Sequence, residues 1–352
     1  MNYFCSTIIA SKVEMTHKVK VAERSDIYIG EVAELLPRLL PERRIVVITD
    51  ANIDRRYHSL LQQYEYIMIG TGETVKTMHT VETIYRKFIE TGIDRSCFVL
   101  GIGGGIVTDI AGFVASTYMR GLDFGFVSTT LLGQVDAGIG GKNGVNIDRY
   151  KNMVGTFTQP RFVICDVELL RTLPDREFRA GLAEVIKAGI IANKRLFEIL
   201  ERTTPDALRN NTTLLSKTVL AAIKVKANIV NNDERESGER RKLNLGHTFA
   251  HAIEKCSSAL NHGEAVAVGT IIISRIAAKL GVLAEKDAAR ITALFEKFGF
   301  DTVSPVTTRR MINAIAKDKK TSGEFIYIVL PTGIGSCEVQ RTKLAEIAAI
   351  VE

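Results

Sequence analysis

The sequence predicts a two-part α/β protein, with an N-terminal Rossmann-like, doubly wound parallel sheet over residues 1–155 and a mostly α-helical C-terminal part over residues 156–352. Three observations predict this architecture. Short β-branched runs alternate with amphipathic stretches before residue 155, which is typical of a parallel sheet covered by helices. Long helical patterns dominate after it. A chain of 352 residues is also long enough to form two apolar cores.

The expected strands are short apolar runs. They are residues 44–50 (RIVVITD), 66–70 (YIMIG), 97–104 (CFVLGIGG) and 124–130 (FGFVSTT), and TVETIYRKFIETG between the second and third is an expected helix. The expected helices of the second part are DREFRAGLAEVIKAGIIA, TTLLSKTVLAAIKVKANIV, GEAVAVGTIIISRIAAKLG and AARITALFEKFG. No repeat and no Pro/Ser-rich linker separates the two parts. We therefore expect them to be closely joined, with the functional site in the cleft between them.

Composition restricts the class of protein. Lys and Arg exceed Asp and Glu by 46 to 40, without the basic runs of a nucleic-acid binder, and this excess favours an anionic small substrate. The five cysteines are odd in number and scattered, which indicates reduced thiols and a cytoplasmic protein. The first dozen residues lack the pattern of a signal peptide, and no run reaches the ~20 apolar residues of a membrane span. We therefore expect neither export nor a membrane.

A glycine-rich turn is the informative feature of the first part. In FVLGIGGGIVTDIAGFVA a strand leads into Gly103, Gly104 and Gly105, and a helix is expected to begin near Ile106. Such a turn lets the backbone approach a pyrophosphate at the positive end of a helix. Ile106 occupies the third glycine position of the usual motif, and a purely structural turn is the alternative. Asp50 ends a predicted strand, where it is either a ribose ligand or a surface aspartate.

The second part carries a polar stripe. Arg240, Asn244, His247 and His251 are spaced by four, three and four residues, so on one helix they would share a face. A solvent-exposed face is the alternative. Solvent faces are rich in Lys and Glu, however, whereas this face offers Asn and His within an apolar segment, and we expect it to line a cavity.

A metal site is expected near this stripe. Glu184 and Lys187 lie three residues apart in an apolar helical segment, where an unpaired carboxylate would be costly and a salt bridge within the helix is the simplest explanation. One carboxylate with two imidazoles is also a common ligand set of catalytic zinc. Which of His247, His251 and His262 take part is left open by the spacing. The H-E-x-x-H motif of metalloproteases is absent.

Several cationic residues lie around glycine-rich turns, although each of them alone is more often a solvated surface charge. Together they favour a substrate with both phosphate and carboxylate groups, because such oxyanions are bound well by lysine and arginine. The residues are Arg120, Lys142, Lys151, Lys187, Lys226, Arg240 and the DKK of 318–320, with Asp136 and Asn152 among them.

Six motifs in order resemble the 3-dehydroquinate synthase family of the sugar phosphate cyclase superfamily. The motifs are GGGIVTDIAGFVASTYMRG, STTLLGQVDAGIGGKNGVN, KNMVGTF, REFRAGLAEVIKAGII, VKANIVNNDERESGERRKLNLGHTFAHAIE and HGEAVAVG, and the resemblance extends from about residue 45 to residue 332. It implies a carbon–oxygen lyase of the shikimate pathway that depends on NAD and on zinc, with cobalt as a possible substitute. Such an enzyme converts 3-deoxy-D-arabino-heptulosonate 7-phosphate to 3-dehydroquinate and phosphate by transient oxidation, phosphate β-elimination, reduction, ring opening and an intramolecular aldol reaction.

The resemblance also implies roles for individual residues. The zinc ligands would be Glu184, His247 and His262, and His251 would face the substrate. NAD would be held by Asp50, Glu73, Lys76, Gly103, Gly104, Gly105, Ile106, Val107, Thr108, Asp109, Thr129, Thr130, Lys142, Lys151 and Thr172. The substrate-binding and catalytic set would be Arg120, Asp136, Lys142, Asn152, Lys187, Lys226, Arg240, Asn244 and His251, joined by either Lys319 or Lys320. Arg120 would act in the neighbouring subunit of a homodimer.

The chain departs from the family pattern at Ser128, at Ala137 and Gly138, and at Ala250, all of them small residues that affect local loop geometry. Residues before Met15 have no match in the pattern. Three alternatives remain: a cyclase that forms an inosose or valiolone ring, an iron-dependent polyol dehydrogenase, and a non-catalytic regulator that binds NAD or metal. The presence together of Lys226, Arg240, Asn244 and His251 favours a substrate with a carboxylate, and a dehydrogenase would accumulate NADH.

Overall fold

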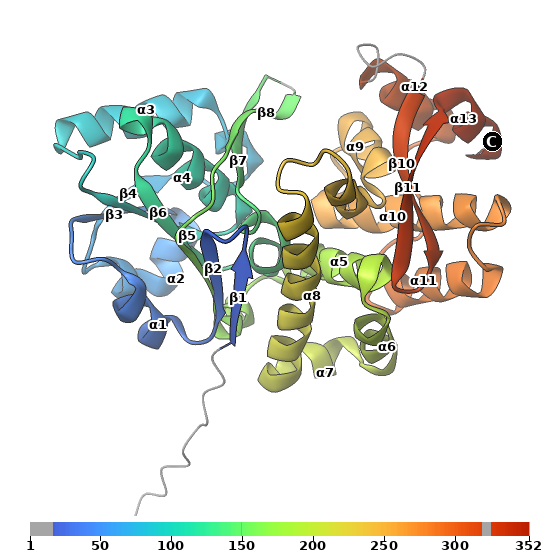
Figure 1. The fold of residues 1–352 in the computed structure, drawn as a ribbon, viewed down its shortest axis with the longest axis horizontal. Coiled ribbons are helices and arrows are strands. Elements are labelled where there is room, and N and C mark those ends of the chain that lie inside the picture. The colour runs from blue at the N-terminus through green and yellow to red at the C-terminus, as the bar shows by residue number, and fades with distance from the viewer. Residues whose placement is uncertain (1–16, 149, 319–324, 352) are drawn as a thin grey trace, which may run out of the picture.

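A computed structural model describes residues 17–148, 150–318 and 325–351, and it places an α/β part beside a helical part (Figure 1). The α/β part is built on a seven-stranded sheet. β1 pairs antiparallel with β2, and the other pairings in this sheet are parallel. In sheet order the strands are β1 (His17–Val21), β2 (Ser25–Ile29), β9 (Phe162–Cys165), β6 (Asp123–Ser128), β5 (Phe98–Gly103), β3 (Ile45–Asp50) and β4 (Glu65–Ile69).

Helices cover both faces of the sheet because its inner strands are apolar on both sides. In β3, Val47 belongs to the cluster formed with α1 and α2, whereas Val46 and Ile48 belong to the cluster formed with α3 and α4. This alternation follows from the two-residue period of a strand. The predicted doubly wound sheet is confirmed. The covering helices are α1 (Val32–Leu39), α2 (Ala51–Leu61), α3 (Met78–Glu90) and α4 (Gly105–Thr117).

The four strands predicted from the sequence are present. The runs at 44–50, 66–70, 97–104 and 124–130 form β3, β4, β5 and β6, and the helix expected near Ile106 begins at Gly105. β1, β2 and β9 add to the sheet beyond the prediction. β9 lies after residue 155 and still occupies an inner position, so the sheet continues past the expected end of the first domain.

The helical part is centred on α5 and α10, which pack against each other and bury nearly all of their apolar side chains. A β-hairpin that the helical patterns did not predict packs on them. The helices are α5 (Asp175–Ala192), α6 (Lys194–Arg202), α7 (Pro205–Asn210), α8 (Thr212–Asn232), α9 (His247–Cys256), α10 (His262–Lys279), α11 (Glu285–Lys297), α12 (Thr308–Asp318) and α13 (Leu344–Val351), and the hairpin is β10 (Phe325–Gly333) with β11 (Ser336–Lys343).

The two parts are joined closely, as expected. α8 lies between the sheet and the other helices in Figure 1, and its Asn231 side chain accepts a hydrogen bond from the backbone N–H of Ala22 next to β1, at 2.7 Å. One apolar cluster extends from the sheet through Leu131 and Val135 into α5 and α8. Buried apolar packing therefore supports both sides of the cleft between the parts.

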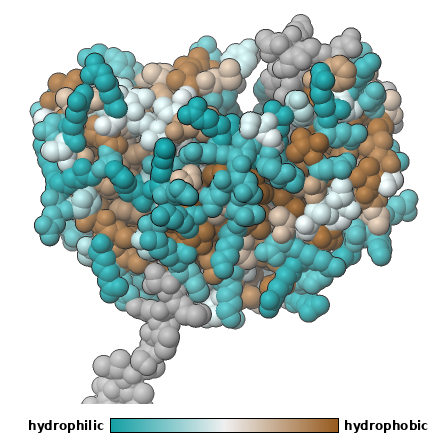
Figure 2. Space-filling view, viewed as in Figure 1, coloured by the Kyte–Doolittle hydropathy of each residue, from teal (hydrophilic) through white to brown (hydrophobic). Residues whose placement is uncertain are grey.

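A second hairpin, β7 (Lys142–Ile147) with β8 (Tyr150–Phe157), stands between the two parts. β7 packs on α4, while most of β8 is exposed. On the face seen in Figure 2, hydrophilic side chains interrupt the apolar areas. Among the described residues, no helix is long and apolar enough to cross a membrane.

Candidate active site

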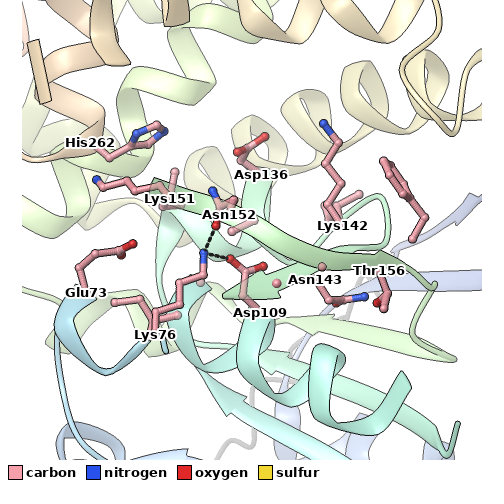
Figure 3. Close-up of a pocket in the computed structure, with 18 of the residues that line it drawn as sticks. Glu73, Lys76, Asp109, Asp136, Lys142, Asn143, Lys151, Asn152, Thr156 and His262 are labelled. Atoms are coloured by element: carbon pink, nitrogen blue, oxygen red, sulfur yellow. Dashed lines mark hydrogen bonds and ion pairs between the residues drawn. The ribbon is translucent and has the colours of Figure 1, made fainter. Parts of the chain in front are cut away.

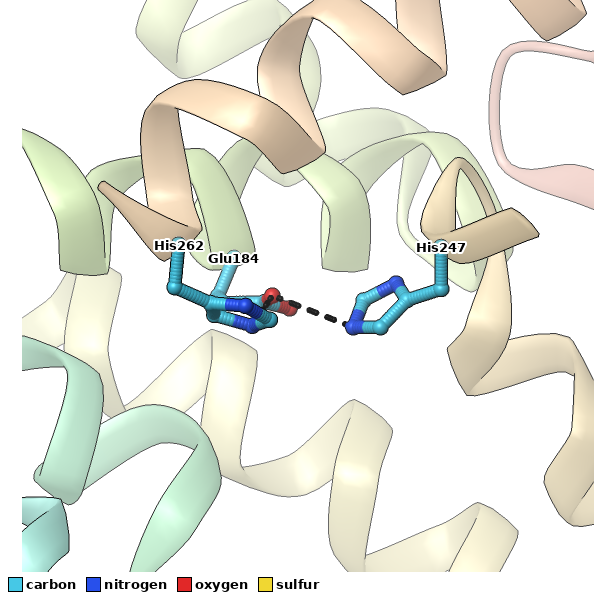
Figure 4. Close-up of side chains that lie close together, drawn as sticks. All are labelled: Glu184, His247 and His262. Atoms are coloured by element: carbon cyan, nitrogen blue, oxygen red, sulfur yellow. Dashed lines mark ion pairs between the residues drawn. The ribbon is translucent and has the colours of Figure 1, made fainter. Parts of the chain in front are cut away.

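Three side chains from three helices converge in the helical part (Figure 4). Glu184 comes from the middle of α5, and His247 and His262 are the first residues of α9 and α10. The Nε2 atoms of both imidazoles lie 3.8 Å from Oε1 of Glu184, and one potential ligand atom from each residue lies within 4.8 Å of the others. A single ion bound at about 2 Å from each ligand would need only a small contraction of this group.

Acceptors on the far side of each imidazole fix its orientation. Nδ1 of His247 lies 3.2 Å from the carbonyl oxygen of Leu245, and Nδ1 of His262 lies 3.4 Å from the carboxylate of Glu254. A proton on each Nδ1 leaves the Nε2 lone pair directed at Glu184. Burial, followed by the nearby charge of Lys187, lowers the pKa of His247 well below its ordinary 6.5. The neutral imidazole, which is the form that binds metals, therefore prevails at neutral pH.

The Glu184 carboxylate also suits a cation. The residue is 3% exposed and makes an ion-pair contact with Lys187, which was the simpler of the two interpretations of this pair from the sequence. Within the described chain, no group donates a hydrogen bond of good geometry to either of its oxygens. Buried carboxylate oxygens in this condition are stabilised by a bound cation, so the residues present fit zinc.

The expected stripe from Arg240 to His251 does not lie on one helix, and that prediction is wrong. A 3₁₀-helix ends at Asn244, and α9 begins at His247. Gly246 between them has φ +80°, and a side chain there would also lie 2.4 Å from Thr270 Oγ1. Glycine thus allows the turn that directs His247 toward Glu184. His251 is exposed on α9, with its ring 5.4 Å from that of His247.

A cationic cavity of about 580 Å³ is lined in part by His262, one of these three residues. Lys226 of α8 donates hydrogen bonds to the backbone carbonyl of Asp136, at 2.6 Å, and to its carboxylate. Burial would raise the pKa of Asp136, but the charges of Lys226 and Lys187 hold it well below its usual range. Figure 3 shows Asp136, Lys142, Asn152 and His262 around this space. Arg240 and Lys226 also line it.

Glu236, which the sequence did not single out, contacts two of the predicted substrate residues. Its carboxylate contacts the Lys142 ammonium and accepts a hydrogen bond from the Asn244 side chain. Arg240, 2% exposed, donates to the carbonyl oxygen of Gly140 at 2.9 Å and also to that of Glu234. Burial lowers the pKa of this guanidinium, and neighbouring carboxylates oppose that effect.

A second cavity, of about 680 Å³, lies along the carboxyl ends of the parallel strands. This is the usual place for a dinucleotide in an open α/β sheet. A Cβ on Gly104 would lie 2.8 Å from Thr130 Cγ2, and one on Gly105 would lie 2.9 Å from Ala137 Cβ, so the turn before α4 is closely packed on its protein side. The predicted cofactor residues that line the cavity are Asp50, Glu73, Gly104, Gly105, Ile106, Val107, Thr129, Thr130, Lys151 and Thr172.

Lys76 and Asp109 connect the glycine turn to the hairpin. The Lys76 ammonium is 2.5 Å from both the Asp109 carboxylate and the Asn152 side-chain oxygen (Figure 3). Burial raises the pKa of Asp109, and Lys76 counteracts the shift. Asp50 caps α2, with its carboxylate accepting from the backbone N–H groups of Asn52 and Ile53. Asp50 also lines the second cavity, so it is not the simple surface aspartate that was the alternative interpretation.

The two cavities adjoin at one metal-ligand candidate, His262. His262, Lys151 and Glu73 line both. Arg120 lines neither: it is exposed, with φ +71° next to Met119 at φ +48°. Lys319 and Lys320, as well as the stretch before Met15, lie outside the described residues.

Comparisons with known proteins identify relatives over most of the chain. Residues 66–180 match the model of the 3-dehydroquinate synthase N-terminal family, and residues 181–321 match that of the C-terminal family. A 3-dehydroquinate synthase from Pelobacter propionicus is 43% identical over 82% of this chain and 81% of its own length.

Two solved structures are similar throughout. A 2-epi-5-epi-valiolone synthase from Streptomyces hygroscopicus subsp. jinggangensis, with NAD+ and Zn2+ bound, is 29% identical with a TM-score of 0.85 and covers 95% of this chain and 96% of its own. A 2-deoxy-scyllo-inosose synthase, complexed with carbaglucose-6-phosphate, NAD+ and Co2+, is 25% identical with a TM-score of 0.83 and covers 96% and 99%.

Proposed function

The chain belongs to the 3-dehydroquinate synthase family, and from this premise we propose how its residues carry out the reaction. The activity is that of a carbon–oxygen lyase, the conversion of 3-deoxy-D-arabino-heptulosonate 7-phosphate to 3-dehydroquinate and phosphate. The observation that carries the assignment of the site is a junction. A carboxylate and two imidazoles face one another, and one of these imidazoles, that of His262, lines both a dinucleotide-sized cavity and a cationic cavity.

Glu184, His247 and His262 would hold the metal, zinc or cobalt, as the two structural relatives bind these ions with NAD+. When bound, the metal ion supplies Lewis acidity at a substrate hydroxyl, and NAD supplies a hydride acceptor that later returns the hydride, so that no net oxidation results. The chain contributes the rigid geometry. Leu245 and Glu254 fix the tautomers of the two histidines, and Lys187 balances the Glu184 charge.

The substrate anions would bind in the cationic cavity. Lys142, Lys226 and Arg240 reach it from three elements, and they suit a phosphate and a carboxylate that must stay fixed through several steps. The Lys226 ammonium is buried, and burial lowers its pKa while Asp136 opposes this effect. The Lys226 ammonium donates a hydrogen bond to the Asp136 carboxylate. Arg120, Asn152, Lys187, Asn244 and His251 complete the proposed set, Arg120 from the partner subunit.

The dinucleotide would lie along the second cavity. The backbone N–H groups at the start of α4 suit its pyrophosphate, because they point out of a helix N-terminus. Asp50, at the carboxyl end of β3, suits a ribose hydroxyl. The nicotinamide end would then lie near Lys151 and His262, where the cavities meet.

We also propose that the protein acts in the cytoplasm as a homodimer. Scattered cysteines support the first point, and Arg120 supports the second. Arg120 is exposed, and Met119 and Arg120 are two consecutive non-glycine residues with positive φ, a backbone that costs of order 1–3 kcal/mol per residue and persists where surroundings or function require it.

Product analysis tests the function. The purified chain is mixed with zinc, NAD and the heptulosonate phosphate, and phosphate, dehydroquinate and NADH are followed. We expect phosphate and dehydroquinate in equal amounts with no build-up of NADH. Phosphate release from glucose 6-phosphate instead would assign an inosose-type cyclase, and accumulation of NADH would assign a dehydrogenase.

A further inference from the structure

Glu254 links the helical part to the α/β part directly behind a metal-ligand candidate. It lies in the third turn of α9, and its side chain is 8% exposed. Its Oε1 is 2.9 Å from the Lys151 ammonium and 3.4 Å from Nδ1 of His262. Lys151 belongs to β8, on the opposite side of the cleft. One carboxylate oxygen therefore connects a cavity wall of the first part to the imidazole of the second.

This connection lies where the metal ion and the dinucleotide would meet. Lys151 and His262 line both cavities, and Figure 3 shows the two side chains next to each other. Glu254 lines the dinucleotide cavity. Any shift of the hairpin β7–β8 relative to α9 changes the Lys151–Glu254 distance, and a carboxylate that moves also moves the acceptor of the imidazole proton.

The Glu254 carboxylate is nearly enclosed, and the Lys151 ammonium and the His262 imidazole both lie against its Oε1 atom. A charged acceptor makes the stronger hydrogen bond to an imidazole N–H and attracts Lys151 at the same time. Both interactions depend on the same oxygen atom.

We propose that Glu254 is a positioning residue that couples metal binding to dinucleotide binding, an inference that rests on the proposed metal and NAD sites. An ion on Nε2 fixes the His262 ring, the ring fixes the Glu254 carboxylate, and the carboxylate fixes Lys151 and the hairpin that walls the dinucleotide cavity. Once the metal ion has ordered this connection, the dinucleotide binds without the entropic cost of ordering it, and the reverse holds when the dinucleotide binds first. Linkage makes the effect equal in both directions.

Three substitutions in the full-length protein separate the contact of Glu254 with His262 from its contact with Lys151. In E254Q, the amide oxygen still accepts from His262 Nδ1, but the charge that attracts Lys151 is lost. In K151M, Glu254 and His262 keep their contact, and the link to the hairpin is lost. In E254A, both contacts are lost. The controls are E90Q and K87M. They disrupt the Lys87–Glu90 ion pair, which is 2.8 Å long and lies on the exposed surface of α3.

Zinc affinity is measured by competition with a chromogenic chelator, and NAD affinity by calorimetry with and without zinc. In the wild type, we expect zinc to tighten NAD binding by about 5- to 150-fold. E254Q and K151M should bind zinc nearly as the wild type does, and their NAD affinity should no longer respond to zinc. E254A should bind zinc about 10- to 100-fold more weakly. E90Q and K87M should match the wild type in every value.

Persistence of the zinc effect on NAD affinity in both E254Q and K151M would overturn the proposal, as would zinc affinity in E254A equal to that of E90Q. Circular dichroism checks that each variant is folded, and if E254A is not, E254Q and K151M decide. A wild-type protein that binds neither zinc nor NAD would instead refute the proposed function, and this inference with it.

Discussion

Glu184 and Lys187 lie one helical turn apart on α5 and form an ion pair in which the side chains are only 2% and 4% exposed. Two charges at this depth stabilise each other, and removing one of them leaves the other uncompensated, at a cost of about 3–5 kcal/mol. A metal ion on Glu184 would take over the role of the lysine charge.

We therefore expect K187M to be less stable than the wild type without metal and to recover most of that stability when zinc is added. Urea unfolding with and without zinc measures both effects. The control is K87M, because Lys87 pairs with Glu90 on an exposed surface. Equal stabilisation of K187M and the wild type by zinc would mean that the ion does not contact Glu184.

The glycine turn supplies a steric prediction. G104A places a Cβ 2.8 Å from Thr130 Cγ2, at a cost of about 1–3 kcal/mol for overpacking, whereas the control G238A meets nothing within 4 Å. Because the turn must shift to relieve this contact, we expect NAD to bind G104A about tenfold more weakly, a loss of about 1.4 kcal/mol of binding free energy. Calorimetry measures the affinity. Unchanged NAD binding in G104A would place the dinucleotide away from this turn.

The loop before Arg240 predicts a pH dependence. Burial opposes the shift, but backbone N–H groups of Gly238, Ser237 and Arg240 hold the pKa of Asp233 well below its ordinary 3.8. A lowered folded-state pKa gives stability that is fully present above 3.8 and is lost as the pH falls toward the folded value.

In D233N, stability at pH 7 should fall, and the further loss between about pH 4 and pH 2 should be shallower than in the wild type. Chemical denaturation at a series of pH values gives both slopes. Parallel curves for the two proteins would show that the Asp233 carboxylate does not stabilise the loop.

Arg120 predicts complementation between subunits. R120M and E184Q should each be inactive alone. If Arg120 acts in the partner's site, co-expression of the two gives mixed dimers with one intact site, and a statistical mixture should show about a quarter of wild-type activity. Phosphate release from the separated mixed dimer measures it. An inactive mixed dimer would place Arg120 in its own subunit's site, and activity of R120M alone would place Arg120 outside the site altogether.

Much of the fold followed from local patterns. β3 to β6 are buried strands bounded by turn residues, and their apolar runs predict them directly. β9 is just as apolar, in FVIC, but it is only four residues long and lies beyond the change to helical patterns. Its place between β2 and β6 depends on pairing across more than a hundred residues, which no local pattern contains.

The site, like the fold, could be predicted only in part from local sequence patterns. Carboxylate, imidazole and ammonium groups could be selected by type, and the family resemblance assigned them roles. Spacing failed at Gly246, because a residue with φ +80° ends the helical period between Asn244 and His247. Glu254 was missed because a Glu before a Lys near a helix end reads as a solvated charge. Its position seven residues after His247, on the same face of α9, was the available signal.

Anomalous diffraction at the zinc edge, from crystals grown with zinc and NAD, locates the metal ion directly. We expect one strong peak per chain, within bonding distance of Glu184 Oε1 and of the Nε2 atoms of His247 and His262. A peak bound by other residues, or none at this place in zinc-saturated crystals that hold NAD, would contradict the proposed metal site.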